Sequence, residues 1–313
     1  MVDKEYSVVV PVCNEKGNIK KLDKEIKEVL DKISKDYEII YVNDASSDNS
    51  LEILKSLKKV KVISLNKNYG QATALDVGFK AALGEIVISM DGDGQNDPKD
   101  IPKMLKKLDK ENLDVVTGWR KNRKDKSGIK ILSKFGKSLR RFFLHDRVHD
   151  TGCTLRVYRK KAVKSLDLQG EMHRYILALL RWKGFKIGEI EVNHRKRENG
   201  KSKYAYKKMY KGFVDLIYIW FIQKFSQRPL HMFGLAGITS SGIGVLIELW
   251  MLWMKIFNGI SLSDNAWFLL GFFLIITGIL LFSFGIVLDI VIKVYHNTSP
   301  FEKKCYIREF LEK

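Results

Sequence analysis

Cysteine is scarce in this chain, and no segment resembles a leader sequence. Only three cysteines, Cys13, Cys153 and Cys305, occur among the 313 residues; they are widely spaced and follow no metal-binding pattern. This argues against a disulfide framework or a zinc site and predicts reduced thiols in a cytosolic domain. The six histidines also lack metal-ligand spacing. Because the charged N-terminus runs directly into an apolar strand pattern, we expect no signal peptide.

Acidic residues are greatly outnumbered, since 55 Lys and Arg face 36 Asp and Glu and give a net charge of +19. A nucleic-acid-binding protein could carry such a charge. However, no recognition motif accompanies it, and the interleaved aromatic residues typical of single-strand binding are missing. The basic residues instead concentrate near the apolar C-terminal part. We therefore expect attraction to an anionic membrane surface and no nucleic-acid partner.

Two long apolar runs predict membrane-spanning helices. Phe233–Met254 contains no Lys, Arg or Asp, and Trp267–Leu288 contains no charge, so each can cross about 30 Å of hydrocarbon. Lys and Arg number 49 before residue 233 and 5 after residue 292. The positive-inside rule then predicts an integral protein of the cytoplasmic membrane with both termini cytoplasmic. Glu248 is expected at a helix–helix contact or as a neutral carboxyl group. A hairpin in a soluble core is the alternative.

Two further segments combine basic and apolar residues at helical spacing. These are Ser127–Phe143 and Lys207–Gln223, which we expect to lie at the membrane interface as amphipathic helices. Packing of these helices on the sheet is the alternative. Arg228-Pro229 marks the break before the first membrane helix.

Short apolar runs alternate with helical segments in the first 120 residues. The predicted strands are Ser7–Val12, Tyr37–Val42, Val60–Leu65, Glu85–Met90 and Asp114–Thr117. Alternating strands and helices indicate βαβ units, and hence an α/β domain with a mostly parallel sheet. In such sheets, ligands bind beyond the carboxyl ends of the strands.

Acidic residues follow several of these strand ends. Asp91 and Asp93 follow the fourth run, and Gly92 and Gly94 let the backbone turn so that both carboxylates converge. Together with the amide oxygen of Gln95, they suit Mg²⁺ or Mn²⁺, which prefer oxygen ligands. For an isolated Asp-x-Asp, a solvated acidic turn would be an equal alternative.

Three segments at strand ends carry a family resemblance. Pro11-Val12-Cys13-Asn14-Glu15, Val42–Asp48 and Asp91–Pro98 resemble the motifs of family-2 inverting glycosyltransferases with the GT-A fold. Arg197-Glu198-Asn199-Gly200-Lys201-Ser202-Lys203 resembles the Arg-x-x-Gly-x-Ser-Lys segment of the polyprenyl-phosphate branch, the dolichol-phosphate-mannose-synthase-like enzymes. Asp150–Arg156 resembles that branch's Asp-x-x-Ser-Gly-Phe-Arg region, although the glycine is displaced and Leu155 replaces an aromatic residue. The resemblance covers roughly residues 5–210.

The resemblance implies a domain plan and a set of site residues. The plan is a GT-A (Rossmann-like) domain at 1–203, an interfacial helix region at 204–230, two transmembrane helices within 231–292 and a cytosolic tail at 293–313. The implied catalytic residues are Asp91, Asp93 and Asp150, and the metal ligands are Asp91, Asp93 and Gln95. The implied nucleotide-binding residues are Pro11, Asn14, Glu15, Asp44, Gln71 and Asp91. The candidates for holding an acceptor phosphate are Arg120, Arg156, Arg197 and Lys203.

These features predict an enzyme that moves one sugar from a nucleotide-sugar to undecaprenyl phosphate for cell-envelope glycosylation. A UDP-hexose is favoured because the two-span tail resembles that of bacterial glucosyl-transferring relatives. A lipid phosphate is ionised near neutral pH, so this nucleophile needs cationic partners rather than a strong base. The alternatives are a processive or hydroxyl-acceptor polysaccharide synthase of the same fold and a non-catalytic, nucleotide-binding membrane scaffold. Each of these three interpretations is compatible with a homo-oligomer.

Overall fold

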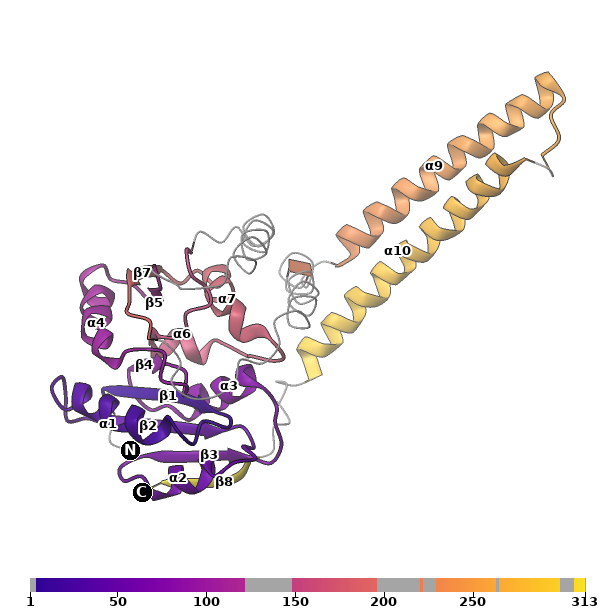
Figure 1. Ribbon diagram of the computed structural model, residues 1–313. Coiled ribbons are helices and arrows are strands. Elements are labelled where there is room, and N and C mark those ends of the chain that lie inside the picture. The colour runs from indigo at the N-terminus through magenta and orange to yellow at the C-terminus, as the bar shows by residue number, and fades with distance from the viewer. Residues whose placement is uncertain are drawn as a thin grey trace. The chain divides into compact units, whose positions relative to one another are not determined.

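The computed structural model describes residues 4–121, 148–195, 220–221, 229–262, 265–298 and 307–312 (Figure 1). The chain forms two compact units, one made of Met1–Leu216 and Lys304–Lys313 and the other of Ile217–Lys303. Several predictions fall outside the described residues: the helix at Ser127–Phe143, most of the helix at Lys207–Gln223, and the site residues Arg197 and Lys203.

The first unit is built on an eight-stranded mixed sheet with the strand order β7-β5-β6-β4-β1-β2-β3-β8. Its strands are β1 (Tyr6–Val12), β2 (Tyr37–Asn43), β3 (Lys61–Leu65), β4 (Ile86–Ser89), β5 (Val115–Trp119), β6 (Arg156–Arg159), β7 (Ile187–Glu191) and β8 (Ile307–Glu312). Strands β4, β1, β2 and β3 run parallel to one another, as do β5 and β7. Strand β6 is antiparallel to both β4 and β5.

The central strands are mostly apolar on both faces because helices cover both faces of the sheet. Val8 and Val10 point into one buried cluster, and Val9, between them, points into the other. Helices α1 (Ile19–Leu30), α2 (Ser50–Ser56) and α4 (Ile101–Lys110) supply apolar residues to the first cluster. Helices α3 (Gln71–Ala81), α6 (Lys160–Lys164) and α7 (Ile176–Trp182) supply the second. The predicted α/β class with a mostly parallel sheet is confirmed.

One edge of the sheet is formed by the end of the chain. After the two apolar helices, β8 returns to pair antiparallel with β3, placing Leu311 opposite Val62 and Phe310 opposite Ile63. The sequence analysis treats residues 293–313 as a tail and does not predict this strand. Strand β8 occupies hydrogen-bonding groups of β3 that would otherwise be an open sheet edge.

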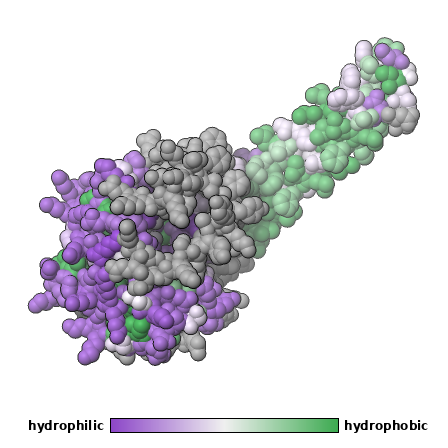
Figure 2. Space-filling model, in the orientation of Figure 1, coloured by the Kyte–Doolittle hydropathy of each residue, from purple (hydrophilic) through white to green (hydrophobic). Residues whose placement is uncertain are grey.

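The second unit contains two long apolar helices, α9 (Pro229–Asn258) and α10 (Ala266–Thr298). Both are long and apolar enough to cross a membrane, and few of their residues are buried within the protein. Figure 2 shows hydrophobic surface along this unit. The helices pack closely at small residues, since a Cβ on Gly237 would lie 2.5 Å from the carbonyl oxygen of Gly278. Glu248 of α9 lies against Gly271 of α10, consistent with the expected helix–helix contact.

A buried ion pair lies near the start of the parallel strands. The Glu38 carboxylate accepts hydrogen bonds from the Ser7 hydroxyl (2.5 Å) and the Leu83 N–H (2.7 Å), and it lies 2.9 Å from the Lys61 ammonium. Burial opposes ionisation, but these partners together hold the pKa of Glu38 below its usual value. Glu38 therefore stays ionised in the folded protein.

We expect Glu38→Gln to lower the stability of this unit by about 3 kcal/mol, because it removes the buried carboxylate charge that faces the Lys61 ammonium. The folded-state pKa is lowered, so the stabilisation is fully present above the ordinary glutamate pKa, about 4, and is lost as the pH falls through the folded pKa. Thermal unfolding in detergent at neutral and acidic pH measures this difference. Glu52→Gln, in an exposed pair with Lys55, is the control. A stability difference that persists in strong acid would contradict the prediction.

Candidate active site

A cleft lies at the carboxyl ends of the parallel strands. It has a volume of about 190 Å³ and is lined by Pro11, Val12, Cys13, Glu15, Asp44, Gln71, Ala74, Asp91, Gly92 and Asp93. The end of β1, the loops after β1, β2 and β4 and the first turn of α3 supply these residues. The structure thus brings together six predicted site residues, Pro11, Glu15, Asp44, Gln71, Asp91 and Asp93.

Asn14 organises the loops beside this cleft. It adopts a left-handed backbone conformation (φ 61°) that asparagine tolerates better than most residues. Its side-chain oxygen accepts hydrogen bonds from the backbone N–H groups of Ser47 (2.7 Å) and Asp48 (3.3 Å). Asn14 therefore ties the loop after β1 to the loop after β2. Its predicted contact with the nucleotide stays a prediction.

Asp44 fixes the entry to helix α3. Its carboxylate is buried and accepts hydrogen bonds from the N–H groups of Tyr69 (2.7 Å) and Gly70 (2.9 Å). Gly70 has φ 90°, a conformation that favours glycine. The next residue, Gln71, donates from Nε2 to the Asp91 carboxylate at 2.6 Å. A continuous set of contacts thus runs from the end of β2 to the acidic loop.

Asp91 and Asp93 form the acidic centre of the cleft. Burial and then the charge of Asp93 raise the pKa of Asp91 to about 6, against the effects of the Thr154 hydroxyl and of Arg120 and Arg156. A carboxylate whose ionisation is opposed by a neighbouring negative charge forms a site that a cation would stabilise. Hard oxygen donors suit Mg²⁺ or Mn²⁺. The described residues contain no group of three or more His, Cys, Asp or Glu that could hold a metal. Further ligands would therefore have to be groups of another kind or lie outside the described residues.

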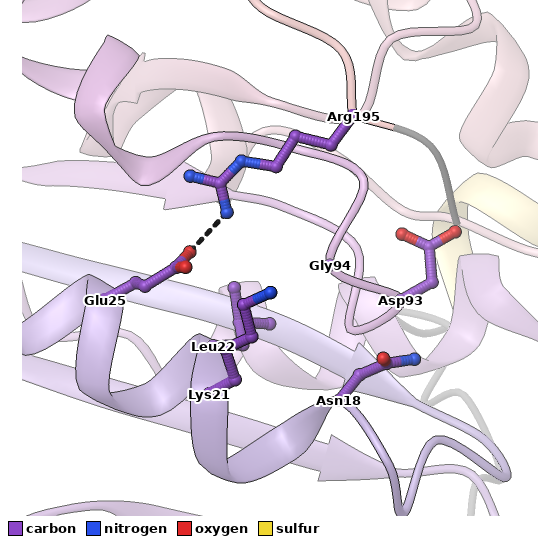
Figure 3. Close-up of a pocket in the computed structure, with 7 residues that line it drawn as sticks. All are labelled: Asn18, Lys21, Leu22, Glu25, Asp93, Gly94 and Arg195. Atoms are coloured by element: carbon purple, nitrogen blue, oxygen red, sulfur yellow. Dashed lines mark hydrogen bonds and ion pairs between the residues drawn. The ribbon is translucent and has the colours of Figure 1, made fainter. Parts of the chain in front are cut away.

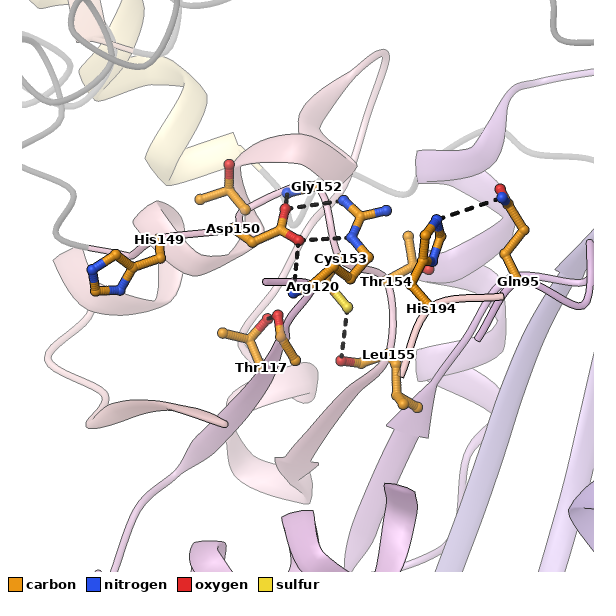
Figure 4. Close-up of polar contacts among 12 residues, drawn as sticks. Gln95, Thr117, Arg120, His149, Asp150, Gly152, Cys153, Thr154, Leu155 and His194 are labelled. Atoms are coloured by element: carbon orange, nitrogen blue, oxygen red, sulfur yellow. Dashed lines mark hydrogen bonds and ion pairs between the residues drawn. The ribbon is translucent and has the colours of Figure 1, made fainter. Parts of the chain in front are cut away.

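Gln95 lies beside this pair but is not among the residues that line the cleft. Its side-chain nitrogen is 3.5 Å from Nε2 of His194 and 3.4 Å from the carbonyl oxygen of Arg195 (Figure 4). Its backbone N–H donates to the Asp93 carboxylate at 3.1 Å. Gln95 thus shapes the acidic loop, and its role as a metal ligand stays a prediction.

Arg120 and Asp150, which the sequence analysis assigns to separate roles, form one ion pair. Nε of Arg120 donates to Asp150 at 2.7 Å and Nη2 donates at 2.9 Å, a two-pronged contact drawn in Figure 4. Although burial disfavours its charged form, the Asp150 partner raises the pKa of Arg120 above its ordinary value. The pair joins the end of β5 to the segment before β6.

Arg156 lies on β6 and is only 2% exposed. Its Nη2 donates to the carbonyl oxygen of Thr151 at 2.7 Å, and its Nη1 lies 3.5 Å from the carbonyl oxygen of His173. It is close enough to favour ionisation of Asp91. Its predicted contact with an acceptor phosphate would require access to a buried guanidinium. The structure describes neither Arg197 nor Lys203, the other two cationic candidates.

Two contributors to the site were missed by the sequence analysis. Thr154 hydrogen-bonds Asp91 and also accepts a hydrogen bond from Asn96 at 2.9 Å. It lies in the quoted Asp150–Arg156 motif, but no spacing rule singles it out. Arg195 contacts the acidic loop and lies two positions before the start of the Arg-x-x-Gly-x-Ser-Lys segment. A contact between segments about 100 residues apart leaves no local sequence signal.

Comparison with known proteins places this geometry in context. The family model described as "Glycosyl transferase family 2" matches residues 7–167. The chain is 32% identical over 306 residues to a dodecaprenyl-phosphate galacturonate synthase of Rhizobium johnstonii, covering 95% of this chain and 90% of that protein. It is 33% identical to an undecaprenyl-phosphate 4-deoxy-4-formamido-L-arabinose transferase of Pectobacterium atrosepticum, covering 86% and 83%.

Solved structures share the fold. Glucosyl-3-phosphoglycerate synthase of Mycobacterium tuberculosis, in complex with Mn²⁺, UDP and glucosyl-3-phosphoglycerate, matches with a TM-score of 0.55 at 17% identity. The match covers 70% of this chain and 80% of that one. The same enzyme with Mg²⁺ and UDP matches with a TM-score of 0.53.

Proposed function

The chain belongs to glycosyl transferase family 2, and from this premise we propose that it moves one sugar from a nucleotide-sugar to a polyprenyl phosphate, with inversion at the anomeric carbon. The observation that carries the proposal is the cleft in which Asp44, Gln71, Asp91 and Asp93 converge at the carboxyl ends of parallel strands. The relatives named for dodecaprenyl- and undecaprenyl-phosphate products match over most of this chain and support the lipid acceptor.

The donor nucleotide is proposed to bind between the loops after β1 and β2. Pro11 and Glu15 line the cleft there, and Asn14 and Asp44 hold the surrounding backbone in place. This arrangement pre-positions the loops before the donor arrives, which reduces the entropy lost on binding. We propose a UDP-sugar as donor, a choice supported by the UDP found in structures of the same fold.

Asp91 and Asp93 would hold a divalent cation, Mg²⁺ or Mn²⁺, which supplies positive charge to the leaving diphosphate. The two residues fit this task because both line the cleft and the charge of Asp93 opposes ionisation of Asp91, so that a cation beside them would be stabilising. Gln71 donates to Asp91 and so fixes its orientation. Gln95 donates to Asp93 through its backbone.

The acceptor phosphate is proposed to need positive charge rather than a general base, because a phosphate monoester is largely doubly ionised near neutral pH. The bidentate ion pair between Arg120 and Asp150 supports the absence of a general base, since a carboxylate held by a guanidinium is a poor proton acceptor. Arg120 and Arg156 add positive charge near Asp91. Arg197 and Lys203 are proposed to contact the phosphate itself.

Helices α9 and α10 are proposed to anchor the protein in the cytoplasmic membrane with both chain ends on the cytoplasmic side. The pairing of β8 with β3 supports this topology, because the residues after α10 join the same sheet as the residues before α9. Two crossings return the chain to the side on which it started.

This topology predicts that a cysteine introduced at Ser261, between the helices, reacts with a membrane-impermeant maleimide in intact cells. Wild-type protein is the matched control, because its native cysteines should react only after the membrane is permeabilised. Mass spectrometry of the labelled peptides locates the modification. Labelling of Cys305 in intact cells would contradict the topology.

The direct test of function is transfer of radiolabel from a panel of nucleotide-sugars to a short-chain polyprenyl phosphate. The panel includes UDP-glucose, UDP-N-acetylglucosamine and GDP-mannose, and the full-length protein is assayed in membranes. A product that is a lipid-linked monosaccharide supports the proposal. Extension of an oligosaccharide without lipid glycosylation would favour a processive enzyme, and absence of any transfer with nucleotide binding retained would favour a scaffold.

A further inference from the structure

We propose that Arg195 is a positioning residue that fixes the acidic loop, residues 91–97, against helix α1 and so sets the place of Asp93 in the cleft. The inference rests on the metal–nucleotide site proposed above. Arg195 would act through Asp93 and would not itself touch the donor.

One guanidinium joins two separate elements. Nη1 of Arg195 lies 2.6 Å from the carboxylate of Glu25 on α1 (Figure 3). Its Nη2 lies 2.7 Å from the carboxylate of Asp97 at the end of the loop. The side chain of Arg195 is 29% exposed and that of Asp97 is 12% exposed, so the contacts are partly shielded from water. A planar guanidinium can hold two carboxylates at fixed angles, which a lysine cannot reproduce.

The backbone reinforces this contact. The N–H of Arg195 donates to the carbonyl oxygen of Gln95 at 2.9 Å, and His194 forms an antiparallel bridge with Asn96. Gln95 in turn donates its own N–H to the carboxylate of Asp93 at 3.1 Å. Asp93 is therefore two hydrogen bonds away from Arg195.

The acidic loop needs such support. Its first four residues include two glycines, Gly92 and Gly94, and Gly94 has φ 74°. Asp93 lines the nucleotide cleft on one side and, on the other, a small pocket bordered by Glu25 and Arg195. Because its two glycines have no side chains to pack, a turn that carries Asp93 between two hollows relies on polar contacts to hold it.

Cation binding depends on how well its ligands are held in place. The two carboxylates must stay close despite their mutual repulsion, and ligand groups usually have to be held within about 0.5 Å. Partners that support metal ligands typically contribute about tenfold to a hundredfold in metal affinity. Loss of Arg195 should therefore weaken the part of nucleotide binding that depends on the metal and spare the part that does not.

The experiment compares nucleotide affinity with and without metal. Full-length wild-type protein in detergent is titrated calorimetrically with UDP and with GDP, in Mn²⁺ and in EDTA, and the nucleotide that binds is used for the variants. The variants are Arg195→Gln and Glu25→Gln, the second of which keeps the contact between Arg195 and Asp97. Arg159→Gln is the control, because the Arg159 side chain is exposed to a similar degree and also pairs with a carboxylate, that of Asp109.

We expect Arg195→Gln to reduce the Mn²⁺-dependent gain in affinity about tenfold, with Glu25→Gln intermediate and Arg159→Gln unchanged. Affinity in EDTA and the melting temperature should stay close to those of the wild type. If both variants keep the full Mn²⁺-dependent gain, the inference is overturned and the proposed function stands. Equal losses in Mn²⁺ and EDTA would mean a general structural role and also overturn it. A wild-type protein whose nucleotide affinity ignores Mn²⁺ would overturn the metal site together with this inference.

If Arg195→Gln does not fold, Glu25→Gln decides the question by the same comparison. A full Mn²⁺-dependent gain in that variant overturns the inference, and a partial loss confined to Mn²⁺ supports it.

Discussion

Asp93→Asn should reduce sugar transfer by roughly two to three orders of magnitude while leaving the protein folded. The substitution removes one of the two carboxylates proposed to hold the cation, and a metal contributes several kcal/mol to stabilising the leaving group. The asparagine oxygen can still accept the hydrogen bond that Asp93 receives from Gln95, so the loop should keep its conformation. The melting temperature should therefore change little.

The measurement is transfer activity as a function of Mn²⁺ or Mg²⁺ concentration, beside a melting curve in detergent. Asp109→Asn is the control, because it removes a carboxylate on helix α4 that is 65% exposed and pairs with Arg159. Full wild-type activity in EDTA would rule out a metal-dependent reaction. A large fall in melting temperature for Asp93→Asn would show that this residue is structural.

Arg197→Ala and Arg197→Lys should each lower transfer to polyprenyl phosphate by about ten- to a hundredfold. A charge-assisted hydrogen bond contributes roughly 1.5–3 kcal/mol, and a lysine cannot replace the two parallel hydrogen bonds that a guanidinium makes to a phosphate. Arg197 itself lies outside the described residues. Arg195, two positions earlier, is described by the structure and contacts Asp97 of the acidic loop.

Both Arg197 substitutions should weaken the use of the acceptor rather than the binding of the donor. We expect a raised Michaelis constant for short-chain polyprenyl phosphate and nearly unchanged calorimetric affinity for the donor nucleotide. Arg181→Lys, on helix α7, serves as a control because no cleft residue comes from that helix. A collapse of nucleotide affinity with an unchanged acceptor constant would assign Arg197 to the nucleotide site instead.

The sequence predicts the central strands well because burial leaves a strong local pattern. Strands β1 to β5 come from apolar runs covered on both faces, and their observed bounds differ from the predicted ones by only one or two residues. Strand β6 is only Arg-Val-Tyr-Arg, and β7 is a partly exposed edge strand containing Gly188 and two glutamates. Neither run is apolar enough to be recognised alone. Strand β8 depends on pairing with a distant strand, which local periodicity cannot predict.

The candidate site shows the same difference between residues that a local pattern predicts and contacts that join distant parts of the sequence. Residues directly after parallel strands, such as Asp44 and Asp91, could be predicted because strand ends meet at one edge of the sheet. Contacts between loops could not be predicted in this way. The ion pair of Arg120 and Asp150 joins residues 30 positions apart, and that of Arg195 and Glu25 joins residues 170 positions apart. Sequence reasoning treats each of these charges as free, whereas folding pairs them and changes which groups remain available for ligands.

The position of β8 also sets an order of events during synthesis. Strand β3 is made early, but its partner β8 follows both apolar helices in the chain and is made only after them. At about 5–20 residues per second, the edge of β3 stays unpaired for on the order of ten seconds or more. Unpaired edges invite aggregation and recognition by chaperones. Closure of this sheet edge therefore depends on a segment made after both apolar helices, so the first unit can be completed only once the chain beyond α10 has returned to it.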